Sequence, residues 1–168
     1  MRIRDIKNRT EGVTLLALTI TIVILSIIAG ITIYSGKDTI KKAKLEELKT
    51  NLLLIQAKAR EYIEEATFKM GINPDDNKKH EIREEVYVQN AKLKKANNVP
   101  TEFGITDTTT CYWLTESAQI NWGLSKMDVD EKERYLIQFN ESDGTVEVYN
   151  SLGYNGNYSL TDIDKLQK

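Results

Sequence analysis

The feature that most constrains this chain is an uncharged apolar run near its N-terminus. No charged residue occurs from Val13 to Gly36, and the segment Val13–Ile33 contains 13 Leu, Ile or Val residues. On the insertion scale each of these favours membrane insertion by about 0.3 to 0.6 kcal/mol. At about 1.5 Å per residue, a helix of roughly 24 residues spans about 36 Å, enough to cross a hydrocarbon core of about 30 Å. The run therefore predicts one membrane-spanning helix over residues 13–36.

Two other interpretations of this run stay open. A buried helix of a soluble protein usually keeps a polar face, which this run lacks. A secretory signal peptide has an apolar region of about 7 to 15 residues and ends in a pair of small residues. Here the run is longer, and Ile27, Ile31 and Ile33 interrupt the pairs of small residues. A membrane-spanning helix fits the run better than either.

A short charged segment precedes the apolar run and ends in glycine. Residues 1–12 carry four basic and two acidic side chains, and Gly12 stands directly before the run. The order Gly12-Val13-Thr14-Leu15-Leu16 resembles the N-terminal signal of type IV prepilins and type II secretion pseudopilins. This resemblance implies that prepilin peptidase cuts between Gly12 and Val13 and leaves the apolar helix attached to the protein. Glycine suits such a site because it has no side chain and a permissive backbone.

The resemblance has one clear departure. The family usually carries glutamate at the fifth position after the cut, and this chain has Ala17 there. A subgroup of pilin-like proteins from Gram-positive bacteria also lacks that glutamate, and the segment is most similar to theirs. Basic residues flank the run on both sides in nearly equal number, so their count does not orient the helix. The resemblance implies a cytoplasmic leader and an extracellular head.

Beyond the run, a helical pattern continues until Gly71 and Pro74 supply stop signals. Apolar residues recur at three-four spacing and predict one apolar face of an amphipathic helix. The resemblance implies that a sheet of the head covers this face, and a short coiled coil is the alternative. These residues are Leu45, Leu48, Leu52, Ile55, Ala59, Tyr62 and Ala66.

The remainder of the chain predicts a small head of helices followed by strands. Asp75 and Asp76 can cap a second helix that runs to about Lys95, with Ile82, Val86 and Leu93 on its apolar side. Nine of the 13 aromatic residues then lie from Phe103 to Tyr158. The predicted elements are a strand over Thr109–Leu114, a short helix over Glu116–Trp122, a hairpin pairing Tyr135–Asn140 with Thr145–Asn150, and a second turn at Asn155-Gly156.

These observations predict an α+β fold, and the resemblance implies that the long N-terminal helix packs on a small antiparallel sheet, as in pilins. The predicted divisions are a cleavable leader over residues 1–12, a transmembrane helical half over 13–36, an amphipathic half of the same helix over 37–70 and a globular head over 71–168. With a single cysteine, no disulfide can form within the chain.

Catalytic and metal-binding groups are not predicted. The only histidine, His80, lies in a charged segment and has no partner for nucleophilic catalysis. The acidic residues Asp128, Asp130, Glu131 and Glu133 lack the glycine and ligand spacing of a calcium loop. Cys111 is interpreted as a core residue, with a reactive thiol as the alternative. Near-neutral charge gives no reason to propose nucleic acid as a partner, and no cofactor is expected.

The function that the resemblance implies is that of a structural subunit, not an enzyme. Its partners would be prepilin peptidase, other pilin-like subunits in a filament, and membrane lipid. The alternatives are a permanent single-pass membrane protein with a binding head, whose exposed aromatic residues could form the binding surface, and a secreted soluble domain. Two lines of small residues on the membrane helix are candidate packing seams, because helices approach closely at small residues in lipid. They are Thr14, Thr21 and Thr32 on one line, and Thr19, Ser26 and Gly30 on the other.

Overall fold

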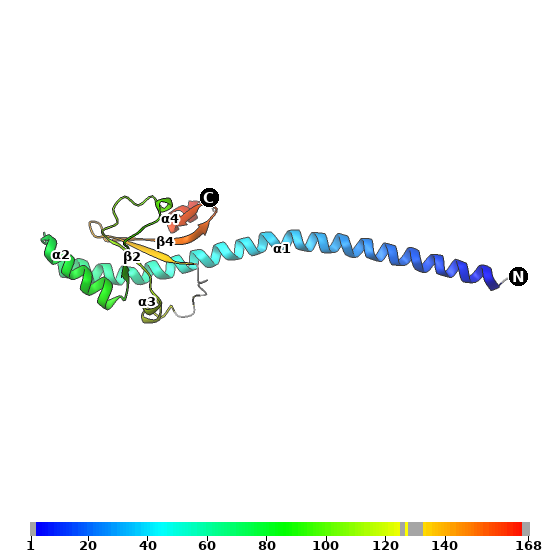
Figure 1. The fold of residues 1–168 in the computed structure, drawn as a ribbon, viewed down its shortest axis with the longest axis horizontal. Coiled ribbons are helices and arrows are strands. Elements are labelled where there is room, and N and C mark those ends of the chain that lie inside the picture. The colour runs from blue at the N-terminus through cyan, green and yellow to red at the C-terminus, as the bar shows by residue number, and fades with distance from the viewer. Residues whose placement is uncertain (1–2, 125–126, 128–132, 166–168) are drawn as a thin grey trace. The chain divides into compact units, whose positions relative to one another are not determined.

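The protein was described from a computed structural model that covers residues 3–124, 127 and 133–165. The first helix is α1 (Ile3–Met70). The structure describes its side chains at residues 17–28 and 39–70. The chain divides into two compact units, residues 1–45 and residues 46–168, and α1 belongs to both. The second unit holds a five-stranded sheet, the remaining helices and the last part of α1, which is drawn in cyan and green in Figure 1.

The sheet confirms the predicted α+β class. Every neighbouring pair of strands is antiparallel, and the strand order follows the chain order without a crossover. Short connections suffice for such a meander, because antiparallel strands can be joined by tight turns. The strands are β1 (Lys94–Lys95), β2 (Cys111–Trp113), β3 (Tyr135–Asn140), β4 (Thr145–Tyr154) and β5 (Asn157–Ser159).

One face of the sheet, here called the inner face, packs against α1 (Figure 1). Side chains alternate between faces along a strand, so Ile137 and its cross-strand partner Val148 share this inner face and are both fully buried. Two polar contacts fix the helix on the sheet. The Asn51 amide donates to the Tyr135 hydroxyl at 3.3 Å, and the Gln56 amide donates to the Val146 carbonyl at 2.8 Å.

The stripe of α1 that meets the sheet largely follows the predicted three-four spacing. Leu45 and Tyr62, which the pattern included, are only half-buried, and Ile63 is fully buried instead. Tyr62 turns toward the side of the helix, where its ring stacks on Trp122 at 5.4 Å between centroids. The buried side chains of the stripe are Leu48, Leu52, Ile55, Ala59, Ile63, Ala66 and Met70.

The second helical region begins where predicted and ends earlier. The Asp75 carboxylate accepts from the Lys78 backbone N–H at 2.7 Å, which caps α2 (Asp76–Arg83). A π-helical segment, η1 (Glu84–Asn90), follows directly. The prediction of a helix to about Lys95 is wrong, because Lys92 has a positive φ of 60° and the chain then enters β1. Leu93 is buried, though not as part of a helix.

The π-helical segment brings Tyr87 into the core. Its ring stacks on Phe139 with centroids 4.0 Å apart and packs edge-on against Tyr112. Next to it the Arg83 guanidinium forms a two-bond ion pair with the Glu141 carboxylate, at 2.8 and 2.5 Å. This pair joins the end of α2 to the turn between β3 and β4.

Short elements complete the head. The predicted short helix is present as α3 (Glu116–Asn121), one residue shorter than predicted. The Thr115 hydroxyl caps it, and Gly123 follows it at φ 72°. The Asn155-Gly156 turn joins β4 to β5 with φ values of 50° and 77°, and positive φ at both central residues is what a type I′ turn requires. A 3-10 turn, η2 (Thr101–Phe103), and a C-terminal helix, α4 (Leu160–Lys165), were not predicted.

Candidate functional site

The described part of α1 nearest the N-terminus exposes aliphatic side chains on every side. Four consecutive residues, from Ile22 to Leu25, cover more than one full turn, because a helix has about 3.6 residues per turn. All eight large side chains of residues 17–28 are between 49% and 65% exposed. A helix that is apolar all round needs an apolar environment to cover it. The eight residues, here called the apolar collar, are Leu18, Ile20, Ile22, Val23, Ile24, Leu25, Ile27 and Ile28.

Within the residues that the structure describes, no helix combines the length and the hydropathy needed to cross a membrane.

The predicted transmembrane segment, residues 13–36, extends past those residues at both ends. Positions 12–16 and 29–36 lie outside the part of α1 whose burial and contacts the structure describes, and the predicted processing residues Gly12 and Val13 are among them. The predicted membrane span and cleavage site therefore stay predictions.

The two predicted packing seams are described only in part. Thr14, Thr32 and Gly30 have side-chain positions outside the described residues, and Thr19 is exposed within the apolar collar. The Thr21 hydroxyl donates to the Leu18 carbonyl at 2.8 Å, and the Ser26 hydroxyl donates to the Ile22 carbonyl at the same distance. Both hydroxyl protons are thus used within the helix itself. A neighbouring helix could therefore approach closely at these two small side chains and donate to their hydroxyl oxygens, but it would receive no hydrogen bond from them.

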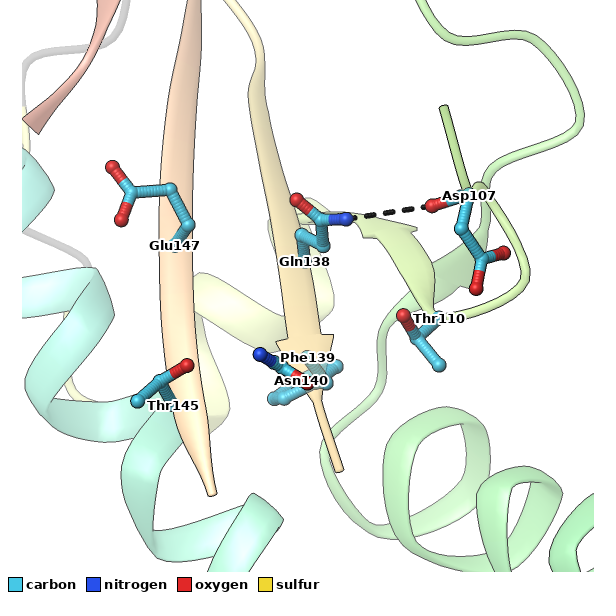
Figure 2. Close-up of a pocket in the computed structure, with 7 residues that line it drawn as sticks. All are labelled: Asp107, Thr110, Gln138, Phe139, Asn140, Thr145 and Glu147. Carbon is cyan, nitrogen blue, oxygen red and sulfur yellow. Dashed lines mark hydrogen bonds between the residues drawn. The ribbon is translucent and has the colours of Figure 1, made fainter. Parts of the chain in front are cut away.

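A second candidate site is a polar pocket in the head, on the face of the sheet opposite α1. This outer-face pocket has a volume of about 300 Å³. Figure 2 shows Gln138 between Glu147 on the neighbouring strand and Asp107 on the segment before β2, with Asn140 and Thr145 further along the two strands. The lining residues are Asp107, Thr110, Gln138, Phe139, Asn140, Thr145 and Glu147.

The pocket exists because the outer face is divided along the strands. At one end of β3 and β4, Leu136 pairs with Tyr149, and the segment after β1 covers them with Phe103, whose ring stacks on Tyr149 at 5.2 Å. At the other end, Gln138 pairs with Glu147 and Asn140 pairs with Thr145. Burial of apolar side chains stabilises the covering segment over the end of the sheet that carries Leu136 and Tyr149. The polar end stays open.

Hydrogen bonds to one another and to neighbouring residues hold two of the lining side chains in place. The Gln138 amide donates to the Asp107 carbonyl at 3.4 Å and accepts from the Tyr149 hydroxyl at 3.2 Å. The Thr109 hydroxyl and backbone N–H both donate to one oxygen of the Asp107 carboxylate, at 2.7 and 2.8 Å. These two bonds lower the pKa of Asp107, first through the hydroxyl. The carboxylate is therefore ionised at neutral pH.

Within the described parts of the chain, the candidate catalytic and metal-binding residues do not form a site. His80 is exposed on α2. Asp128, Asp130 and Glu131 lie outside the described residues, whereas the Glu133 carboxylate accepts from the Tyr135 hydroxyl at 2.6 Å. Over the described parts of the chain, no group of three His, Cys, Asp or Glu side chains is arranged to hold a metal ion.

Cys111 is a buried core residue, as its apolar neighbours in the sequence predict. Burial raises the pKa of its thiol from 9.0 to about 11, because the thiolate loses solvation. The thiolate is the nucleophile, so at pH 8 the shift alone should slow alkylation about a hundredfold relative to the unfolded chain. We expect iodoacetamide to label Cys111 slowly in the native protein and rapidly in denaturant. Equal rates followed by mass spectrometry would contradict the burial.

The outer-face pocket was not predicted from the sequence. Its signal is present, because the hairpin register alone places Gln138, Asn140, Thr145 and Glu147 on one face. What the sequence does not give is the position of Asp107, which depends on the path of the covering segment.

Comparison with known proteins adds no relative: no protein-family model, no curated protein and no solved structure matches this chain.

Proposed function

We propose that this protein is a structural subunit of a pilin-like filament. In this proposal prepilin peptidase removes residues 1–12, the helix after Val13 stays in the membrane, and assembly then moves it into a filament of similar subunits. The head remains outside the cell. The protein acts by assembling with its partners, without catalysis.

The apolar collar is the observation that carries this proposal. It has no charged residue and exposes eight aliphatic side chains all round the helix. Contiguous exposed apolar surface marks a site of contact with lipid or with another protein. Lipid before assembly and neighbouring helices afterwards would cover the same surface. The α+β head built on the last part of α1 is consistent with a pilin-like subunit.

Weak contacts suffice for the assembled state in this proposal. Between helices in lipid, close packing at small residues replaces the hydrophobic drive, and a hydroxyl hydrogen bond adds only about 0.6 kcal/mol on average. The hydroxyls of Thr21 and Ser26 already donate within their own helix. Packing at small residues would therefore contribute more than hydrogen bonds between neighbouring helices.

The mature N-terminus tests the proposal. We expect a start at Val13 when the protein is isolated from cells that contain prepilin peptidase, measured by intact-mass and peptide mass spectrometry. Gly12→Val should abolish this cleavage, because a side chain at the position before the cut hinders access to the backbone. Gly36→Val is the matched control and should be cleaved normally. Normal processing of Gly12→Val would exclude the proposed cleavage site.

A permanent single-pass membrane protein with a binding head is the second candidate function, and the outer-face pocket favours it. In that case the isolated protein would begin at Met1 in the presence of the peptidase, and it would stay in the membrane fraction.

A further inference from the structure

We propose that the outer-face pocket binds a neutral polyhydroxylated ligand of the size of one monosaccharide unit. The pocket lies wholly within residues 46–168 and away from α1, so this proposal does not depend on the proposed function. Its volume of about 300 Å³ is at the lower end of the range of small-molecule pockets, about 300 to 1,000 Å³.

The charges of the pocket exclude anionic ligands. Two of its seven lining residues, Asp107 and Glu147, carry carboxylates, and the lining includes no basic side chain among the described residues. The lowered pKa of Asp107 keeps one of these charges in place well below neutral pH. A phosphate or carboxylate would meet repulsion from these two carboxylates and no basic side chain in the described lining, because Arg83 and Lys95 act on Asp107 from outside it. The ligand is therefore neutral or cationic.

After its internal hydrogen bonds are made, the pocket still offers both donors and acceptors to a ligand. This combination favours a hydroxyl-bearing ligand over a cation. One oxygen of Glu147 accepts from the Thr161 N–H at 3.3 Å, which leaves its second oxygen as an acceptor. The Asn140 amide oxygen accepts from Ser142 at 2.7 Å, which leaves the NH₂ group as a donor. A hydroxyl can both donate and accept, whereas an ammonium group only donates. A sugar can satisfy both sets, and a cation would leave the amide of Asn140 unpaired.

The pocket is also prepared for binding before a ligand arrives. Gln138 is held at both ends of its amide, and Asp107 is held by the two bonds from Thr109. Side chains that are already fixed lose little conformational entropy when a ligand binds. The two strands that carry most of the lining, β3 and β4, pair with each other along their length from Tyr135 to Asn150, so the backbone under the pocket is fixed by the ladder between them. A small polar ligand with few contacts gains most from such a site.

The test is saturation-transfer NMR on the full chain with the methyl glycosides of glucose, galactose, mannose and N-acetylglucosamine. A zwitterionic detergent holds the protein in solution, since sugar-headed detergents would compete for the pocket. We expect at least one glycoside to bind saturably in the millimolar range. Its binding should weaken about five- to tenfold in Asn140→Ala and in Thr110→Val, because each variant removes one hydrogen-bonding group from the pocket.

Two matched variants control for general effects of these substitutions. Asn77→Ala and Thr67→Val change the same residue types at exposed positions that do not line the pocket, and they should bind like the unchanged protein. Thermal unfolding of all four variants confirms that each is folded.

A cationic probe, N-acetyl-lysine methylamide, separates the two ligand classes. Glu147→Gln keeps an acceptor for Thr161 and removes one charge, so a bound glycoside should lose at most about tenfold in affinity. Binding of the lysine probe alone would overturn the proposal. So would the absence of saturable binding by every glycoside, or equal binding by the pocket variants and their controls.

Discussion

Replacing Gly153 with alanine is expected to destabilise the head by about 3 kcal/mol or more. Gly153 lies in β4 with φ 61°, a conformation that costs an L-residue about 1 to 2 kcal/mol. A Cβ atom there would lie 2.6 Å from Cδ1 of Tyr158 and 2.8 Å from the backbone oxygen of Asn157. Relieving such contacts typically costs a further 1 to 3 kcal/mol. Urea unfolding of the full chain, followed by tryptophan fluorescence, measures the loss.

Gly156→Ala is the matched control for this prediction. Gly156 has a similar φ of 77°, but nothing lies within 4 Å of the position of its Cβ. Only the backbone term applies, so we expect a loss of about 1 kcal/mol. If the two variants lose the same stability, the close approach of β5 to Gly153 is not a feature of the folded protein.

Replacing Leu52 with alanine is the second change with a large expected effect. Leu52 is fully buried between α1 and the inner face of the sheet. Truncating a buried leucine removes its transfer free energy and leaves a cavity, which costs about 2 to 5 kcal/mol. We expect about 3 kcal/mol here, measured in the same urea experiment.

The neighbouring leucine provides the control on the same helix. Leu53 is 46% exposed and faces away from the sheet, so Leu53→Ala should cost less than about 1 kcal/mol. The helix propensities of the two variants change equally, so the difference reports packing alone. If Leu53→Ala proves as costly as Leu52→Ala, then α1 does not present the buried stripe that the structure assigns to it.

The sequence predicted those elements whose own residues decide their structure. The strand Tyr135–Asn140 and the start of its partner at Thr145 agree with the structure, because alternating side chains and a polar turn specify a hairpin locally. The Asp75 cap of α2 agrees for the same reason. Each of these features depends on contacts within a few residues.

The sequence-based predictions are wrong where contacts between residues far apart in the chain decide the local structure. The segment after Asn90 has helix-forming residues, yet Lys94 pairs with Trp113 and Lys95 with Tyr112. Tertiary pairing thus overrides a weak local preference. The exchange of Tyr62 for Ile63 in the stripe has a similar cause, because Trp122 offers the tyrosine ring a partner at the side of α1. Neither contact can be seen in local spacing.

The candidate sites divide in the same way. The uncharged segment that contains the apolar collar is evident from the local run of apolar residues in the sequence. Prediction of the outer-face pocket requires knowing which end of the sheet is covered. Phe103 and Tyr149 are far apart in the chain, and their stacking decides that question.

The head is assembled from segments that leave the ribosome at very different times. The buried stripe of α1 ends at Met70, but the inner face of the sheet begins with Tyr112 in β2 and is complete only at Val148 in β4. At about 5 to 20 residues per second, synthesis of the intervening residues takes several seconds. The apolar side chains of the stripe have no sheet to cover them during that interval. Such long-range pairing also slows folding itself. The stripe over residues 48–70 is therefore complete well before the strands that cover it in the folded head.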